Sequence, residues 1–231
     1  MSLFSQIRYI AFDLDGTLVD SVPDLAEALR MTLVDLGKEP VTNEEVRNWI
    51  GNGVEIMVKR ALSRNIIIDP ELDNELYLIA RMRFDEHYQN NGASKTQVYP
   101  GVLQTIKVLK NAGFTLGIVT NKPEQFIPNI LADLKLAEYF TDIIGGDTLA
   151  TNKPSPEGLQ FLQQKHQLAT QNMLMVGDSK NDILAAQNAA IASVGLTYGY
   201  NYGEPIASSN PSAVSNNFSD LLSLLGIRPS N

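Results

Sequence analysis

The sequence predicts an α/β protein in which a doubly wound, Rossmann-like parallel sheet carries an inserted bundle of helices. Short, continuous apolar runs, typical of strands buried on both faces, alternate with amphipathic helical patterns over most of the chain. One region, residues 22–91, instead reads as helical throughout. Hydrophobic residues make up 44% of the 231 residues, which provides for a sizeable core.

The expected strands are residues 7–12, 114–120, 142–145, 173–177 and 191–196. Helical patterns lie between and after them, near residues 101–112, 124–134, 156–166, 179–190 and 218–225. A strand that alternates with a helix indicates βαβ units, and the strands of such units run parallel. The sheet should therefore be parallel and covered by helices on both faces.

The helical region has its own start and stop signals. Its four expected helices cover residues 23–37, 43–50, 54–63 and 70–91. Pro23 suits the first turn of a helix, and Thr42 with Glu45 forms a capping box. We therefore expect a core domain of residues 1–21 and 92–231 and a helical-bundle cap domain of residues 22–91. Two interpretations stay open: a cap that moves as a lid, and a helical layer packed rigidly on the sheet.

Composition excludes several classes of protein. The chain has no cysteine, so disulfides, thiolate catalysis and cysteine zinc sites are excluded. Its net charge of −8 argues against non-specific binding to nucleic acid or to anionic membranes. The N-terminus does not resemble a secretory signal, and no stretch approaches 18 consecutive apolar residues. We expect a cytoplasmic protein with no nucleic-acid or membrane partner.

Polar residues follow several of the predicted strands. They are Asp13, Asp15, Thr120, Asn121, Asp178, Ser179 and Asp182, with Lys153 between the 142–145 strand and the next helix. Ligands of open parallel sheets bind at the carboxyl ends of the strands, so these residues should meet at one site. Each also has an ordinary interpretation, such as a helix cap made by Ser179 and Asp182. Their joint occurrence in this order favours a functional site.

Such a site would concentrate negative charge. Two unit charges about 4 Å apart repel by about 4 kcal/mol at an effective dielectric constant of about 20. Four aspartates, Asp13, Asp15, Asp178 and Asp182, would face only the positive charge of Lys153. A divalent cation would balance the remainder, and Mg²⁺ suits one or two carboxylates together with a substrate phosphate.

With these motifs the chain resembles the haloacid dehalogenase superfamily of phosphotransferases. The resemblance rests on DLDGTLVDS at residues 13–21, on Thr120, on Lys153 and on GDSKND at residues 177–182. A closer resemblance to the phosphoglycolate phosphatases rests on five segments: WIGNGVEIMVKRAL (49–62), YPGV (99–102), TNKP (120–123), KPSPEGL (153–159) and GDSKNDILAAQNA (177–189). Pyrophosphatases and β-phosphoglucomutase-like enzymes share these segments in part.

The resemblance implies a phosphatase that works through an aspartyl-phosphate. Asp13 is then the nucleophile, and Asp15 is the acid that protonates the leaving group and the base that activates water. Mg²⁺ would be held by the Asp13 side chain, the Asp15 backbone carbonyl and Asp178.

The same resemblance assigns the phosphate-binding groups. Thr120 and the backbone amide of Asn121 would bind phosphoryl oxygens, and Lys153 would neutralise their charge in the transition state. Asp182, with Ser179 beside it, is expected to orient Lys153 or a metal-bound water.

The substrate is expected to be a small phosphorylated metabolite, in first place 2-phosphoglycolate. The Gly51-Asn52-Gly53 turn would let the cap backbone approach it, and the guanidinium of Arg60 would bind its carboxylate. The opposing interpretation is a plain helix–helix connection with a solvated Arg60. Pyrophosphate and sugar phosphates are the competing substrates.

Two further classes stay open at this stage. A receiver-like signalling module also combines clustered aspartates, Mg²⁺, a threonine and a lysine, but it has no use for Asp15 or for a helical cap. A dehalogenase on the same scaffold would not need Asp15, Lys153 and Mg²⁺ together. The pattern does not decide between a monomer and a homodimer, and it assigns no role to residues 197–217.

Overall fold

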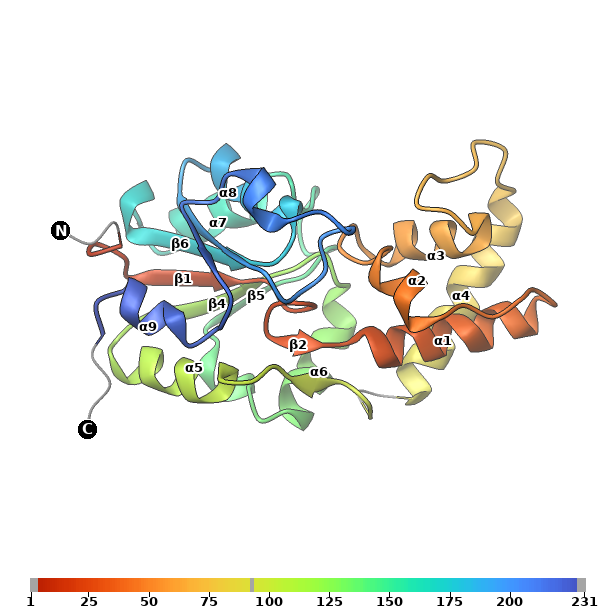
Figure 1. Cartoon of the computed structure of the whole chain (residues 1–231), viewed down its shortest axis with the longest axis horizontal. Helices are drawn as coiled ribbons and strands as arrows, with labels where there is room; N and C mark the ends of the chain where they lie inside the picture. Colours follow the sequence, from red (N-terminus) through yellow and green to blue (C-terminus); the bar gives the residue numbers. More distant parts are fainter. Residues whose placement is uncertain (1–3, 92–93, 228–231) are drawn as a thin grey trace.

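The computed structural model describes residues 4–91 and 94–227, and in this part the chain forms a six-stranded parallel sheet next to a helical bundle (Figure 1). The strand order is β5–β4–β1–β6–β7–β8. Their bounds are β1 Tyr9–Phe12, β4 Thr115–Val119, β5 Asp142–Ile144, β6 Met173–Gly177, β7 Ala192–Leu196 and β8 Ala213–Ser215. The predicted fold class is confirmed. Strand β8 was not among the predicted strands, because this edge strand is three residues long and carries no continuous apolar run.

Helices cover both faces of the sheet, as expected for buried parallel strands. One face packs against α5 (Val102–Asn111), α6 (Ile127–Asp133) and α9 (Asp220–Leu224), and the other against α7 (Glu157–Lys165) and α8 (Lys180–Asn188). Alternate residues of β1 serve the two faces: Ile10 and Phe12 belong to the first core, and Tyr9 and Ala11 to the second.

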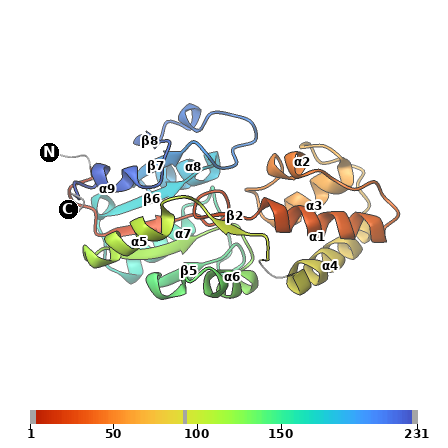
Figure 2. The ribbon, with the colours of Figure 1, turned by 60° about the horizontal axis from the view of Figure 1, so that its bottom comes forward.

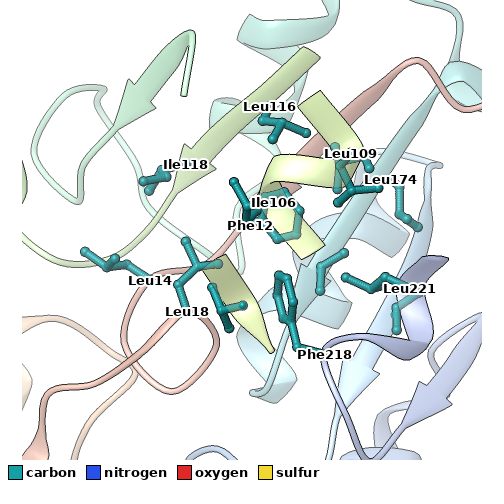
Figure 3. Packing of buried hydrophobic residues seen from close by; sticks show 14 of the residues in the cluster. Phe12, Leu14, Leu18, Ile106, Leu109, Leu116, Ile118, Leu174, Phe218 and Leu221 are labelled. Carbon is teal, nitrogen blue, oxygen red and sulfur yellow. The ribbon is translucent and has the colours of Figure 1, made fainter. Parts of the chain in front are cut away.

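Phe12 lies near the middle of the larger core, among side chains from α5, β4 and the C-terminal segment (Figure 3). Its ring centroid is 5.6 Å from that of Phe218, and both side chains are fully buried. Burial of an aromatic side chain of this kind contributes about 3–5 kcal/mol, judged by the cost of its truncation to alanine. The strand that ends at Asp13 is therefore fixed by packing just before the polar site begins.

The inserted helices form a second hydrophobic core. They are α1 (Val22–Asp35), α2 (Asn43–Arg47), α3 (Val54–Ser63) and α4 (Asn74–Asn91). The predicted capping box of Thr42 and Glu45 is present, but α2 ends at Arg47, three residues before the predicted end. Helix α4 begins at Asn74 rather than at the predicted residue 70, and it ends at Asn91 as predicted. Among the helices of the described ranges, none combines the length and the apolar composition that a bilayer span requires.

The two chain crossings between sheet and bundle lie side by side. Strand β2 (Val19–Asp20) pairs antiparallel with β3 (Gln97–Val98), a short ribbon that the sequence did not predict (Figure 2). Asp24 of α1 joins the crossings further, because its buried carboxylate accepts hydrogen bonds from the Lys95 backbone amide at 3.1 Å and the Thr96 hydroxyl at 2.6 Å. The domain boundaries after residues 21 and 91 stay a prediction.

We expect Asp24→Ala to lower the free energy of unfolding by about 2–3 kcal/mol, because several hydrogen bonds to a buried carboxylate are lost. Urea unfolding followed by circular dichroism measures this change. Asp35→Ala is the matched control, since Asp35 ends the same helix and its side chain is 41% exposed. Equal losses in the two variants would contradict the proposed tie between the crossings.

Candidate active site

The carboxyl ends of the strands face the helical bundle (Figures 1 and 2), and the predicted polar residues follow these strand ends. Asp13 follows β1, Thr120 follows β4 and Asp178 follows β6. These strands are parallel neighbours in the order β4–β1–β6, so their carboxyl ends adjoin one another. The sheet therefore brings together residues that are more than 100 positions apart in the chain.

Lys153 is the cation at the centre of the buried carboxylates. Its Nζ lies 2.9 Å from Asp13 Oδ1 and donates a hydrogen bond of 2.5 Å to Asp182 Oδ1. The other oxygen of Asp182 accepts from the Ser179 backbone amide at 2.9 Å and from its hydroxyl at 3.1 Å. The same carboxylate, that of Asp182, thus completes the capping box at the start of α8 and holds the ammonium of Lys153. Both predicted roles of Asp182 and Ser179 fit this geometry.

Asp178 is held from two sides. Its Oδ1 accepts from the Thr17 hydroxyl at 2.5 Å, and its Oδ2 accepts from the Tyr200 backbone amide at 2.6 Å. Gly16 passes so close that a Cβ there would overlap the Asp178 carboxylate, and its φ of 92° is one that glycine adopts without strain. The glycine after Asp15 is therefore required for the approach of the two strand ends.

The carboxylates present suit a hard divalent cation. Asp13, Asp178 and Asp182 each have a carboxylate oxygen within 4.8 Å of the others, and all three are buried. Their negative charges exceed the positive charge of Lys153. Carboxylate oxygens are the donors that Mg²⁺ prefers. Asp182 accepts three hydrogen bonds, from Lys153 and Ser179. Each Asp178 oxygen, by contrast, accepts one and Asp13 Oδ1 is buried without a hydrogen-bond partner, so Asp13 and Asp178 are the side chains that best fit a metal.

The environment shifts the proton affinities of these groups. Burial raises the pKa of the Asp13 carboxyl from 3.8 to about 6, against the opposing effect of Lys153. Burial also raises the pKa of Asp178 well above its ordinary value, and the charges of Asp182 and Asp13 add to that rise. For Lys153, burial favours the neutral amine, but Asp13 and Asp182 outweigh it and raise the pKa. The cluster thus favours either proton uptake or a bound cation.

Asn121 connects the site to the cap in a way that the sequence did not suggest. Its side-chain Nδ2 donates to the backbone carbonyl of Gly51 at 2.9 Å and to that of Lys153 at 2.8 Å. Asn181, one residue before Asp182, also donates to the Gly51 carbonyl, at 2.9 Å. Two asparagines of the sheet domain, next to Thr120 and Asp182, therefore donate hydrogen bonds to the same backbone carbonyl of the cap.

A cavity of about 30 Å³ lies between the strand ends and the cap. Its lining residues are Asp13, Asp15, Leu25, Ile50, Gly51, Gly53, Val54, Met57, Thr120, Asn121 and Lys122. The glycine turn approaches the core closely, since a Cβ on Gly51, whose φ is 113°, would overlap the Tyr202 hydroxyl; its predicted approach to the substrate stays a prediction. Asn52, the middle residue of the predicted turn, is not among the lining residues.

The structure contradicts the predicted position of Arg60. Its guanidinium donates to the backbone carbonyls of Trp49 at 2.9 Å and Ile66 at 3.0 Å, and it lies 5.5 Å from the centre of the Tyr202 ring. It does not line the cavity. The physical reason is that backbone carbonyls of two cap loops lie within hydrogen-bond distance of the guanidinium and take up its donors. Arg60 therefore links two loops of the cap, stays partly exposed to solvent, and does not reach the cavity in this structure.

Lys122 is the site residue that the sequence analysis missed. It is 4% exposed, lines the cavity, and its Nζ lies 3.1 and 3.2 Å from the two oxygens of Asp15. Burial favours the neutral amine, yet the Asp15 charge and Tyr88 raise the pKa of Lys122. A signal existed in the TNKP segment, where a lysine follows the phosphate-binding Thr120 by two residues.

Comparison with known proteins identifies the family. The family model described as haloacid dehalogenase-like hydrolase matches residues 10–196. A protein named phosphoglycolate phosphatase from Photobacterium profundum is 52% identical over 225 residues, which cover 97% of this chain and 98% of the relative. One of the same name from Vibrio cholerae is 50% identical over 219 residues, 95% of this chain and 97% of the relative.

A solved structure is similar over nearly its whole length. The crystal structure described as a predicted phosphoglycolate phosphatase from Haemophilus somnus superposes with a TM-score of 0.88 at 37% sequence identity. The match covers 95% of this chain and 98% of that chain. Sheet and cap therefore both have counterparts in this structure.

We expect Asp13→Asn to stabilise the metal-free protein at about pH 8 and to change little at about pH 4. The folded-state pKa of about 6 exceeds the value of 3.8 for the free side chain, so Asp13 favours folding at acidic pH and loses this contribution as the pH rises through 6. Two pKa units correspond to roughly 3 kcal/mol, so a gain of about 1–3 kcal/mol is expected at the higher pH. Urea unfolding with a chelator present measures it, and equal effects at both pH values would refute the argument.

Proposed function

We propose that this chain, which belongs to the haloacid dehalogenase-like hydrolases and within them to the phosphoglycolate phosphatase family, hydrolyses 2-phosphoglycolate to glycolate and phosphate. As a member of this family it is a phosphoric monoester hydrolase, which rules out the receiver-like signalling module. The observation that carries the proposal is the convergence of Asp13, Asp15 and Thr120 on one cavity under the cap, with Lys153 at 2.9 Å from Asp13.

In the first half-reaction, a carboxylate oxygen of Asp13 forms a bond to phosphorus while the bond from phosphorus to the ester oxygen breaks. Asp15 gives its proton to the departing glycolate oxygen. Lys153, which lies 2.9 Å from Asp13, and Thr120 stabilise the charge on the phosphoryl oxygens. The product of this step is an aspartyl-phosphate on Asp13.

In the second half-reaction, Asp15 takes a proton from a water molecule whose oxygen attacks phosphorus. The bond between phosphorus and Asp13 breaks, and phosphate leaves. Asp182 acts through Lys153, since it holds the ammonium against Asp13. Mg²⁺ held by Asp13, Asp178 and the Asp15 backbone carbonyl would supply positive charge that offsets the repulsion between the nucleophile and the phosphate.

The cap has to open for catalysis under this proposal. A cavity of about 30 Å³ holds a few water molecules at most, which is less than a phosphate ester needs. Opening would break the hydrogen bonds from Asn121 and Asn181 to the Gly51 carbonyl. Closure over the substrate excludes water and positions the reacting groups.

We expect Mg²⁺ to raise the melting temperature of the wild-type protein by roughly 5 °C at saturating concentration, because it relieves repulsion among buried carboxylates. Asp178→Ala should lose most of this shift. Asp133→Ala, which removes a solvent-exposed aspartate of helix α6 outside the site, should keep the full shift in melting temperature. Differential scanning fluorimetry with a chelator or with Mg²⁺ makes the measurement. A full shift in the Asp178 variant would contradict the assigned metal site.

We expect kcat/KM to be at least about tenfold higher for 2-phosphoglycolate than for pyrophosphate or glucose phosphates, a factor worth about 1.4 kcal/mol. Phosphate release assays with Mg²⁺ test the panel. Asp13→Asn serves as the background control and should lose at least about 1,000-fold in turnover, since the nucleophile is gone. A tenfold preference for pyrophosphate or a sugar phosphate would overturn the substrate, and an active Asp13 variant would overturn the mechanism.

A further inference from the structure

Lys122 is a buried cation at the substrate cavity that neither the metal site nor the phosphate-binding groups require. Of the described residues that line the cavity, Lys122 alone carries a positive charge. Lys153 does not line the cavity, and its ammonium contacts Asp13 and Asp182. Any second anionic group on a substrate would therefore meet Lys122 first.

The cap side of the cavity cannot substitute for this charge. The side chains that the cap contributes are apolar: Leu25, Ile50, Val54 and Met57. A carboxylate moved into such surroundings loses its hydration and needs a charged partner. Arg60 is excluded because it is turned towards backbone carbonyls of the cap.

The contacts of Lys122 link a catalytic group to the cap. Its Nζ lies within hydrogen-bond distance of both oxygens of Asp15, at 3.1 and 3.2 Å. The same ammonium lies 4.8 Å from the ring centre of Tyr88, a residue of cap helix α4. While both oxygens of Asp15 face Lys122, neither is free to contact the leaving group of a substrate.

We propose that Lys122 exchanges the carboxylate of Asp15 for the carboxylate of the substrate, and so selects the substrate and releases Asp15 for catalysis in one step. No covalent bond changes in this exchange, since one ion pair replaces another. The inference rests on the proposed function, because it concerns the same site and its carboxylate-bearing substrate. A phosphate ester without a carboxylate would leave Asp15 engaged and would react slowly even when bound.

Two substrates that share a two-carbon skeleton test the selection. The ratio of kcat/KM for 2-phosphoglycolate to that for ethyl phosphate is measured in the wild type, Lys122→Met and Lys122→Arg. Loss of a charged contact should lower this ratio by about 10- to 100-fold in Lys122→Met. Lys122→Arg, which keeps the positive charge, should recover part of the ratio.

Lys59 offers a matched control. It also pairs with a carboxylate, that of Glu55 at 2.6 Å, and lies 4.6 Å from the centre of a tyrosine ring, that of Tyr77. It lies outside the cavity, so Lys59→Met should leave the ratio unchanged. If only Lys122→Met lowers the ratio, the effect comes from the position of Lys122 at the cavity. It then does not come from removing any lysine that contacts a tyrosine and a carboxylate.

The release of Asp15 has a separate readout in the wild-type protein. Added acetate should increase kcat for ethyl phosphate several-fold, because a free carboxylate draws Lys122 away from Asp15. In Lys122→Met, kcat for ethyl phosphate should already be raised, and acetate should have no effect. A merely structural lysine would lower kcat for both substrates and would give no activation by acetate.

The outcomes separate this inference from the proposed function. If the wild type does not prefer 2-phosphoglycolate to ethyl phosphate, the proposed substrate is wrong. If the wild type has the preference and folded Lys122→Met shows it undiminished, only the role of Lys122 is wrong. Should neither variant fold, the acetate experiment on the wild type still decides: no activation overturns the exchange.

Discussion

The balance of charge around Lys153 is the interaction on which the rest of the site depends. One ammonium ion is buried against Asp13 and Asp182, and Asp178 lies in the same cluster. Buried carboxylates at this density are costly, and the rise in the pKa of Asp13 to about 6 measures part of that cost. The apolar packing of β1, centred on Phe12, holds the strand end in place against the repulsion.

The buried carboxylates that lower the stability of the fold also make the site suited to phosphate chemistry. A cluster that is short of positive charge attracts a divalent cation, and a cation there in turn attracts the phosphate of a substrate. Active sites commonly combine lower stability with preorganised charge, so that a neutral substitution stabilises the protein and abolishes its activity. The support of Lys153 by Asp182, which is itself fixed by the start of α8, keeps the arrangement rigid.

The cap meets this cluster through a few polar contacts, beside an apolar contact in which Phe126, Ile130 and Tyr200 of the core pack into the hydrophobic core of the cap. Asn121 and Asn181 both bind the carbonyl of Gly51, and each lies next to a residue of the site. Tyr202 packs between Gly51 and Arg60, so residues 197–204, for which the sequence suggested no role, form part of the contact between core and cap. Hydrogen bonds of this kind contribute about 1 kcal/mol each, so they would cost little to break if the cap opens as proposed.

The sequence by itself determined the parallel sheet, the inserted helices and the residues that meet at the strand ends. Continuous apolar runs and helical periodicity are local signals, and parallel strands place residues such as Asp13, Thr120 and Asp178 at one edge whatever the remaining packing. Only the tertiary structure decided which partner each charged or polar side chain takes. Arg60 had carbonyls of its own cap within reach, and Lys122 lies against Asp15, which is 107 positions away. The pattern of neighbouring residues in the sequence cannot specify such pairs. The partner of a long side chain depends on which groups the folded chain places within a few ångströms of it.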